Sequence, residues 1–136
     1  MTSPIITVLF ACVQNAGRSQ MAAALFNAAA DPAKARAISA GTAPAQRVHS
    51  EVVTTMREVG VDLSTGTPRK LTDELAQQAQ WLITMGCGER CPVVPGAHRD
   101  DWAITDPHGQ PPEGVRAIRE DIARRVAELI ARNGWR

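Results

Sequence analysis

Residues 5–19 read IITVLFACVQNAGRS, an apolar run that passes directly into a short polar loop. The run Ile5–Ala11 is nearly continuous and rich in β-branched residues, which is typical of a strand buried on both faces of a parallel sheet. Strong helix formers fill most of Ser19–Ala30, and Asp31-Pro32 then ends the helix. The sequence therefore predicts a strand, a loop and a helix in direct succession.

The loop at Cys12–Ser19 has the composition of an anion-binding site. A loop that enters a helix presents free backbone N–H groups and the positive end of the helix dipole, which together hold a tetrahedral oxyanion. Gly17 permits a tight turn, and Arg18 offers a planar fork for two anion oxygens. The same field favours a thiolate at Cys12, to which Ser19 can donate a hydrogen bond. We expect the substrate to contact Val13, Gln14, Asn15, Ala16, Gly17, Arg18 and Ser19.

The rest of the chain alternates between strand and helix patterns, which indicates an α/β fold with a parallel sheet. Further strands are expected at 36–40 and 81–85, and further helices at 50–60 (capped by Ser50), from Thr72 onward, and along the apolar stripe of residues 115–130. Gly86–Pro112 has little periodicity and is predicted to be one long, functional loop, with a short strand near Val93-Val94. The whole chain, 1–136, is interpreted as a single domain.

Composition excludes several classes of function. The net charge is only +1 and the basic residues are scattered, which gives no electrostatic case for binding nucleic acid or an anionic membrane. The apolar run before Cys12 is too short to span a membrane and lacks the pattern of a signal peptide. Three cysteines, an odd number, fit a reducing compartment better than a disulfide scaffold. A cytoplasmic protein is expected.

Cys12–Ser19 resembles the signature loop of the low-molecular-weight protein tyrosine phosphatases and their arsenate reductase relatives. Gln20 favours the reductase branch, because the phosphatases usually have proline at this position. Other matches are Ser39-Ala40-Gly41-Thr42, Trp81-Leu82-Ile83-Thr84-Met85, and Asp101-Trp102 followed by Asp106-Pro107. The resemblance implies a three-layer α/β fold, with a four-stranded parallel sheet, helices on both faces, and the anion loop at the carboxyl end of a strand.

The resemblance also implies a general acid. In the family, the aspartate of the Asp-Pro pair protonates the leaving oxygen, and this role falls on Asp106 here. The phosphatases generally follow the pair with tyrosine, which helps to hold an aromatic substrate. This chain has His108 at that position and contains no tyrosine. That difference favours arsenate reduction over phosphotyrosine hydrolysis.

Cys87 and Cys91 are candidates for the second thiol that arsenate reduction requires. Thiol–disulfide exchange from Cys12 to Cys87 and then to Cys91 could deliver the electron pair to thioredoxin. Thioredoxin-linked members of the family carry a comparable pair with wider spacing, whereas only three residues separate the pair here. An external thiol, either mycothiol or glutathione together with a redoxin protein, could instead supply the electron pair. The two cysteines could also be inert small hydrophobic residues.

No bound cofactor and no metal are expected. A zinc site from Cys87, Cys91, His98 and His108 would match no established ligand spacing.

The resemblance therefore predicts an arsenate reductase with arsenate and a thioredoxin or redoxin protein as partners. Cys12 attacks arsenic, Asp106 protonates the departing hydroxyl, and a second thiol releases arsenite. The alternative enzyme is a low-molecular-weight protein tyrosine phosphatase, which hydrolyses phosphate monoesters through a phosphocysteine. A non-enzymatic anion sensor would not need the complete set of Cys12, Arg18 and Asp106.

Overall fold

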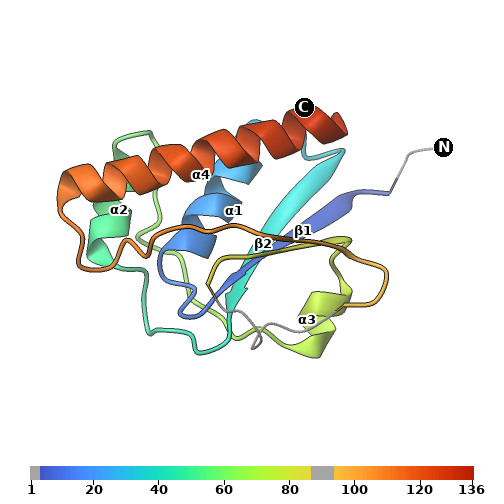
Figure 1. Ribbon diagram of the computed structural model, residues 1–136, viewed down its shortest axis with the longest axis horizontal. Coiled ribbons are helices and arrows are strands. Elements are labelled where there is room, and N and C mark those ends of the chain that lie inside the picture. Colours follow the sequence, from blue (N-terminus) through green and yellow to red (C-terminus); the bar gives the residue numbers. More distant parts are fainter. Residues whose placement is uncertain (1–3, 87–93) are drawn as a thin grey trace.

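The computed structural model, which describes residues 4–86 and 94–136, contains a four-stranded sheet in which every pair of neighbours is parallel (Figure 1). The strand order is β2-β1-β3-β4. The strands are β1 (Ile6–Cys12), β2 (Ala35–Gly41), β3 (Trp81–Thr84) and β4 (His98–Asp101). The carboxyl ends of the two inner strands and β2 therefore meet at one edge of the sheet, where Cys12 pairs with Gly41 and Ala11 pairs with Thr84.

Strand β1 is buried on both faces, as its apolar sequence predicts. Val8 and Phe10 belong to the larger hydrophobic cluster, whereas Leu9 and Ala11 belong to a smaller one. Successive side chains of a strand point to opposite faces, so the two clusters lie on opposite sides of the sheet. This double burial places β1, and the loop that follows it, at the centre of the fold.

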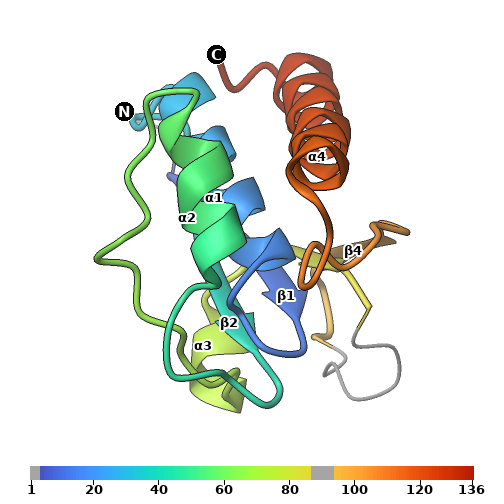
Figure 2. The same ribbon diagram turned by 90° about the vertical axis from the view of Figure 1, so that its left-hand side faces the viewer.

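Three helices cover the face with the larger cluster, and a short helix lies on the other face (Figures 1 and 2). The first three are α1 (Arg18–Ala29), α2 (Ser50–Arg57) and α4 (Pro112–Asn133), and the short helix is α3 (Asp73–Gln77). The apolar stripe of α4 is buried, including Val115, Ile122 and Ile130. The three-layer arrangement with helices on both faces is confirmed.

The region after β3 corrects the sequence prediction. Of the short strand expected near Val93-Val94, Val94 is not part of a strand, and Val93 lies outside the described residues. Strand β4 lies instead at His98–Asp101, in the segment predicted to be loop. All four of its residues are polar and exposed, which is typical of an edge strand protected against further pairing. Because none of its residues is apolar, the pattern of apolar residues in the sequence does not indicate this strand.

The helix starts differ in detail from their predicted caps. Thr72 caps α3, because its side chain accepts a hydrogen bond from the backbone N–H of Leu75. Ser50 does not cap α2 as predicted, since it is the first helical residue and His49 occupies the cap position without a side-chain hydrogen bond. This shift of one residue directs the imidazole of His49, rather than a hydroxyl, toward the carboxyl edge of the sheet.

Glu58 joins α2 to α4. Arg116 donates two-pronged hydrogen bonds to its carboxylate, and the nearly buried Arg119 donates to Glu58 and to the carbonyl of Thr55. The hydrogen bonds from Arg116, and then those from Arg119, lower the pKa of Glu58 to about 2. The pair of helices is therefore held by a charged contact at its rim as well as by its apolar faces.

None of the helices within residues 4–86 and 94–136 is long and apolar enough to cross a membrane.

Candidate active site

Cys12 ends β1 and begins the loop that leads into α1. Its side chain is 2% exposed, and its carbonyl accepts a hydrogen bond from the N–H of Thr42, which follows β2. Gly41 makes this packing possible, because an added Cβ would lie 2.4 Å from the carbonyl oxygen of Val13. The glycine at the end of β2 thus lets the neighbouring strand lie directly against the loop.

Asn15 braces the loop from within. It is fully buried and is the only non-glycine residue among those described with a positive φ, at 50°. Its Oδ1 accepts hydrogen bonds from the N–H of Arg69 and from the amide of Gln20. Its Nδ2 donates to the hydroxyl oxygen of Ser19 at 2.8 Å. One buried side chain therefore connects the loop, α1 and the segment before α3.

The Asn15–Ser19 hydrogen bond orients the hydroxyl toward Cys12. Ser19 Oγ lies 2.8 Å from Cys12 Sγ, and both side chains are buried. Because the hydroxyl oxygen already accepts from Asn15, its proton is free to point at the sulfur. The chain Asn15–Ser19–Cys12 thus supplies a donor to a thiolate, which is the nucleophilic form of cysteine.

Arg18 is held beside the loop by backbone rather than by acidic partners. Its Nη1 donates to the carbonyl of Ile104 at 3.1 Å, while its Nη2 lies 3.9 Å from the carboxylate of Asp106. The guanidinium also packs on Gly86, where an added Cβ would lie 2.6 Å from Nη1. Because the Asp106 pair is long, the planar fork keeps donors for an anion in the pocket.

Asp106 faces the loop from the segment that precedes α4. Its Oδ1 accepts a hydrogen bond from the N–H of His108 at 3.0 Å, and its side chain is 56% exposed. The following Pro107 packs against Gly17, where an added Cβ would lie 2.9 Å from the proline ring. Gly17 therefore serves two purposes, since it begins the helix and makes room for the Asp106-Pro107 segment.

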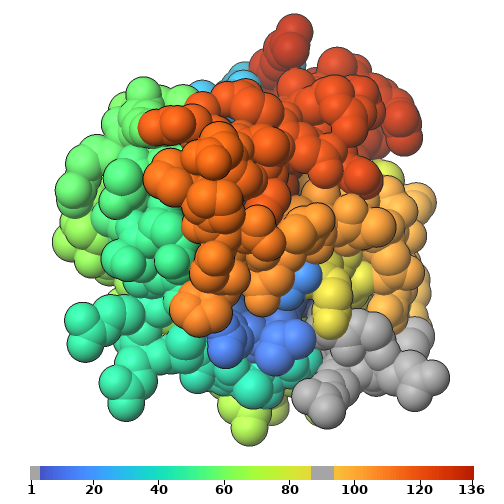
Figure 3. Space-filling model, turned by 60° about the vertical axis from the view of Figure 1, so that its left-hand side comes forward, coloured from blue at the N-terminus to red at the C-terminus, as the bar shows by residue number. Residues whose placement is uncertain are grey.

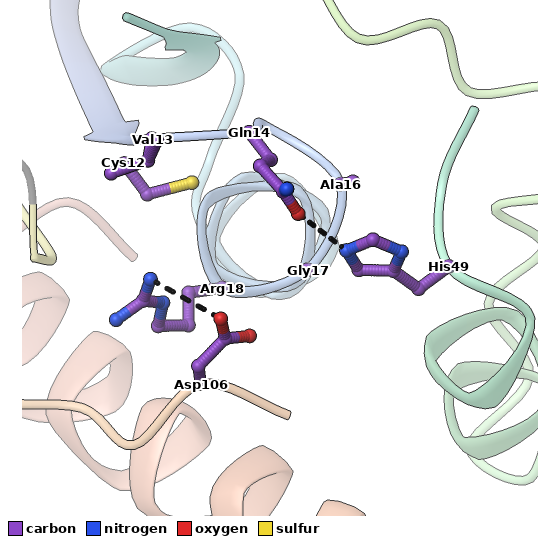
Figure 4. A pocket seen from close by; sticks show the side chains of 8 residues that line it. All are labelled: Cys12, Val13, Gln14, Ala16, Gly17, Arg18, His49 and Asp106. Carbon is purple, nitrogen blue, oxygen red and sulfur yellow. Dashed lines mark hydrogen bonds and ion pairs between the residues drawn. The ribbon is translucent and has the colours of Figure 1, made fainter. Parts of the chain in front are cut away.

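His49 also lines the pocket. Its Nε2 donates to Gln14 Oε1 at 2.9 Å (Figure 4). Its ring also stacks on that of His108, with centroids 4.2 Å apart. Burial lowers the pKa of His49, and nearby His108 lowers it further, although Glu51 and Asp106 oppose this. No sequence pattern singles out this histidine, because its partners come from two other segments.

The pocket has a volume of about 210 Å³. That is below the roughly 300–1,000 Å³ of pockets for drug-sized molecules, so a small ligand fits best. Its lining consists of Cys12, Val13, Gln14, Ala16, Gly17, Arg18, His49 and Asp106 (Figure 4). Figure 3 shows the blue surface of the Cys12–Arg18 loop below the orange segment that carries Asp106.

Most of the site residues expected from the sequence thus come together. Asn15 and Ser19 lie behind the pocket, where they support the loop. Cys87 and Cys91 lie outside the described residues. The two histidines of the weak zinc candidate have separate neighbours, since His98 stacks on Trp81 while His108 stacks on His49.

The sequence model of the low molecular weight phosphotyrosine protein phosphatases matches residues 7–133. The chain belongs to this family. Within the family, a Halobacterium salinarum protein provisionally named an arsenate reductase is 41% identical over 125 residues, which cover 89% of this chain and 88% of that protein. The glutaredoxin arsenate reductase of Synechocystis sp. is 34% identical over 128 residues, covering 92% and 96% of the two chains.

Solved structures of an arsenate reductase and of a phosphatase have the same fold as this chain. The thioredoxin-dependent arsenate reductase of Corynebacterium glutamicum is 40% identical with a TM-score of 0.80. The match covers 95% of this chain but 62% of that longer protein. The low molecular weight protein tyrosine phosphatase of T. tengcongensis is 25% identical, with a TM-score of 0.84 and coverage of 93% and 99%.

The geometry of this family member suits attack on a tetrahedral oxyanion. A buried sulfur lies at the floor of the pocket, a guanidinium and a helix N-terminus lie at its wall, and a carboxyl group stands at its rim. Negative charge that develops on the substrate meets fixed donors, while the carboxyl group can supply a proton.

Proposed function

We propose that this protein is an arsenate reductase, in which the Cys12–Ser19 loop binds arsenate and the thiolate of Cys12 attacks arsenic. The observation that carries the proposal is the buried chain Asn15–Ser19–Cys12, which aims a hydroxyl proton at the sulfur inside an oxyanion pocket. The arsenate reductases among the relatives support the choice of substrate.

The first step forms a sulfur–arsenic bond. Cys12 attacks arsenic, Arg18 and the loop N–H groups hold the remaining oxygens, and one hydroxyl departs. Asp106 gives that hydroxyl a proton, so it leaves as water. The product is an arsenic(V) adduct on Cys12.

The second step reduces arsenic. A second thiolate attacks the sulfur of Cys12, a disulfide forms, and the electron pair of the sulfur–arsenic bond goes to arsenic. Arsenic(V) becomes arsenic(III) and leaves as arsenite, while the two thiols are oxidised to the disulfide. The attacking thiol comes from Cys87, with Cys91 then passing the disulfide to thioredoxin, or from mycothiol or glutathione with a redoxin.

The names of the relatives support a thiol donor of either kind, because one is a thioredoxin-dependent enzyme and another a glutaredoxin arsenate reductase. A reaction that consumes thiols needs a compartment that regenerates them, so we place the enzyme in the cytoplasm. The chain works as one domain, and arsenate and a redoxin-type protein are its partners.

Phosphatase activity is the second candidate, since an oxyanion pocket with a nucleophilic cysteine also fits phosphate monoesters. Here His49 lines the pocket, with the ring of His108 stacked on it, and the chain offers no tyrosine for an aromatic substrate. Hydrolysis of an aryl phosphate is therefore expected to be slow, and rapid hydrolysis of phosphotyrosine peptides would reverse this ranking.

The decisive experiment measures arsenite formation with each reducing system in parallel: thioredoxin, glutathione with glutaredoxin, and mycothiol with its redoxin. Turnover with at least one of them, absent in Cys12→Ser, supports the proposal. No arsenite with any of the three, from folded protein that hydrolyses an aryl phosphate, contradicts it.

A single turnover without added reductant then identifies the second thiol. Mass spectrometry that finds a disulfide including Cys87 supports the internal relay. Free thiols at Cys87 and Cys91, with arsenic still bound to Cys12, assign the second thiol to an external molecule.

A further inference from the structure

Three metal-binding side chains meet at the rim of the pocket, outside the proposed reaction. His49 precedes α2, Glu51 lies in its first turn, and His108 follows Asp106-Pro107. One potential ligand atom of each lies within 4.8 Å of the other two. We propose that His49, Glu51 and His108 form a binding site for a divalent transition-metal ion of the zinc type.

The donor set matches the chemistry of such ions. Two imidazoles and a carboxylate are an established set of three protein ligands for zinc, which leaves a fourth position open to water or substrate. His108 Nδ1 lies 3.3 Å from Glu51 Oε1. Two ligands bound tetrahedrally at roughly 2.0–2.1 Å are about 3.3 Å apart, so this pair already has the spacing of one edge of a zinc site.

Gln14 orients the third ligand, His49, through a hydrogen bond. Its Oε1, which can only accept, lies 2.9 Å from His49 Nε2, so that nitrogen carries the proton. The other nitrogen, Nδ1, is left with a free lone pair in the neutral ring. A metal-binding histidine usually donates its second nitrogen to an oxygen in this way, which fixes its tautomer and its orientation.

The three donors must still move closer together, because they lie within 4.8 Å of one another and a tetrahedral site needs about 3.3 Å. His49 and His108 are already stacked, and the His108 side chain is 60% exposed, so its ring can turn to bring the three donors closer. The positive end of α2 opposes a cation at this position, whereas the Glu51 carboxylate favours it. We therefore expect micromolar binding rather than the very tight binding of a structural zinc site.

The site was absent from the sequence predictions because its ligands come from two distant segments. In the chain, α3, β3 and β4 lie between His49 and Glu51 on one side and His108 on the other. Since His49 also lines the oxyanion pocket, an ion held here borders the substrate and ties the Asp106 segment to α2.

Cobalt(II) is the probe, because it occupies zinc-type sites and its visible absorption reports coordination. Thiols would compete for the ion, so the parent protein carries Cys12→Ser, Cys87→Ser and Cys91→Ser. Wild-type protein alkylated with iodoacetamide repeats the titration in case the triple variant folds poorly. Glu51→Gln and His108→Gln test the site, and His98→Gln, which changes an exposed histidine on β4, is the matched control.

We expect one cobalt ion per chain, displaced by zinc, with no thiolate charge-transfer band. Affinity should fall at least about tenfold in Glu51→Gln and His108→Gln and remain unchanged in His98→Gln. The proposal is overturned if folded protein binds no cobalt up to about 1 mM. It is equally overturned if Glu51→Gln and His108→Gln bind as tightly as the parent.

Discussion

The Cys12–Ser19 loop and the Ile104–His108 segment face each other across the pocket, but they are held in different ways. Inside the loop, Asn15 and Ser19 are fully buried and hydrogen-bonded to each other. In the facing segment, Asp106 and His108 are more than half exposed, and Asp106 meets Arg18 only at 3.9 Å. One side of the pocket is fixed by the fold, and the other lies on the surface.

This difference separates two chemical tasks. An oxyanion is stabilised most when its donors are fixed before it arrives, because no energy is then spent on orienting them. A general acid must instead come within hydrogen-bond distance of an oxygen whose position depends on the bound substrate. The loop is therefore expected to set affinity for the anion, and the Asp106 segment to set the rate of the step that releases water.

Cys12→Ser should have the largest effect and test the loop itself. A serine hydroxyl does not ionise near neutral pH, so the variant should form no adduct and no detectable arsenite. The fold and phosphate binding should remain, because the sulfur–hydroxyl contact is replaced by a similar one. Arsenite assays, circular dichroism and phosphate titration provide the measurements. Retained reduction of arsenate by this folded variant would contradict the mechanism.

Asp106→Asn should show whether the two sides of the pocket really differ in role. An amide cannot donate the acidic proton, so turnover should fall about 10²- to 10⁴-fold. Phosphate affinity should be retained or slightly higher, because a negative charge leaves the pocket rim. Single-turnover kinetics and phosphate titration separate the two effects. Weakened phosphate binding with normal turnover would contradict the division of roles.

Asn15→Ala should reduce both stability and anion binding. Removing a buried side chain that makes several hydrogen bonds leaves their partners unsatisfied, which costs roughly 1–3 kcal/mol. Alanine must also adopt the positive φ of 50°. Urea denaturation gives the loss of stability, and phosphate titration the loss of affinity.

Asn15→Gly is the matched control for the backbone. Glycine adopts the positive φ without cost, so this variant isolates the hydrogen bonds from the conformational strain. If Asn15→Gly matched the wild-type protein in both measurements, the buried hydrogen bonds would not be what holds the loop.

Most of the fold was predictable, because apolar patterns mark the elements that build the core. The run in β1 and the stripe in α4 pack as those patterns predict. Strand β4 was missed because its residues His98–Asp101 are all polar and it pairs only at the edge of the sheet. Its place depends on backbone hydrogen bonds to β3, which leave no trace in side-chain polarity.

The candidate site was predictable only where it is local in sequence. Cys12, Gly17 and Arg18 lie in one loop whose composition indicates its chemistry. The place of His49 in the pocket depends on contacts with Gln14 and His108, which are distant in the chain. The relay through Cys87 and Cys91 stays a prediction.

Glu58→Gln should have the smallest effect. It tests whether the contact of Glu58 with Arg116 and Arg119, between α2 and α4, is separate from the pocket. The neighbouring guanidinium groups, Arg116 first and then Arg119, lower the pKa of Glu58 from 4.5 to about 2. A carboxylate with a lowered pKa contributes stability that is fully present above its unfolded value. That stability is lost as the pH falls from 4.5 through about 2. The variant should therefore be less stable than the wild-type protein near neutral pH, and the difference should shrink across this window.

Urea denaturation of both proteins at several values of pH measures that difference, and Glu74→Gln, on the exposed part of α3, controls for the loss of a negative charge. Phosphate affinity near neutral pH should be the same in all three proteins, because Glu58 does not line the oxyanion pocket. A constant stability difference from neutral to acidic pH would mean that the Arg116 contact contributes nothing through the charge of Glu58. Weakened phosphate binding in Glu58→Gln alone would mean that the contact between α2 and α4 also shapes the pocket. The contrast between the buried loop and the exposed Asp106 segment would then be less complete than their hydrogen bonds indicate.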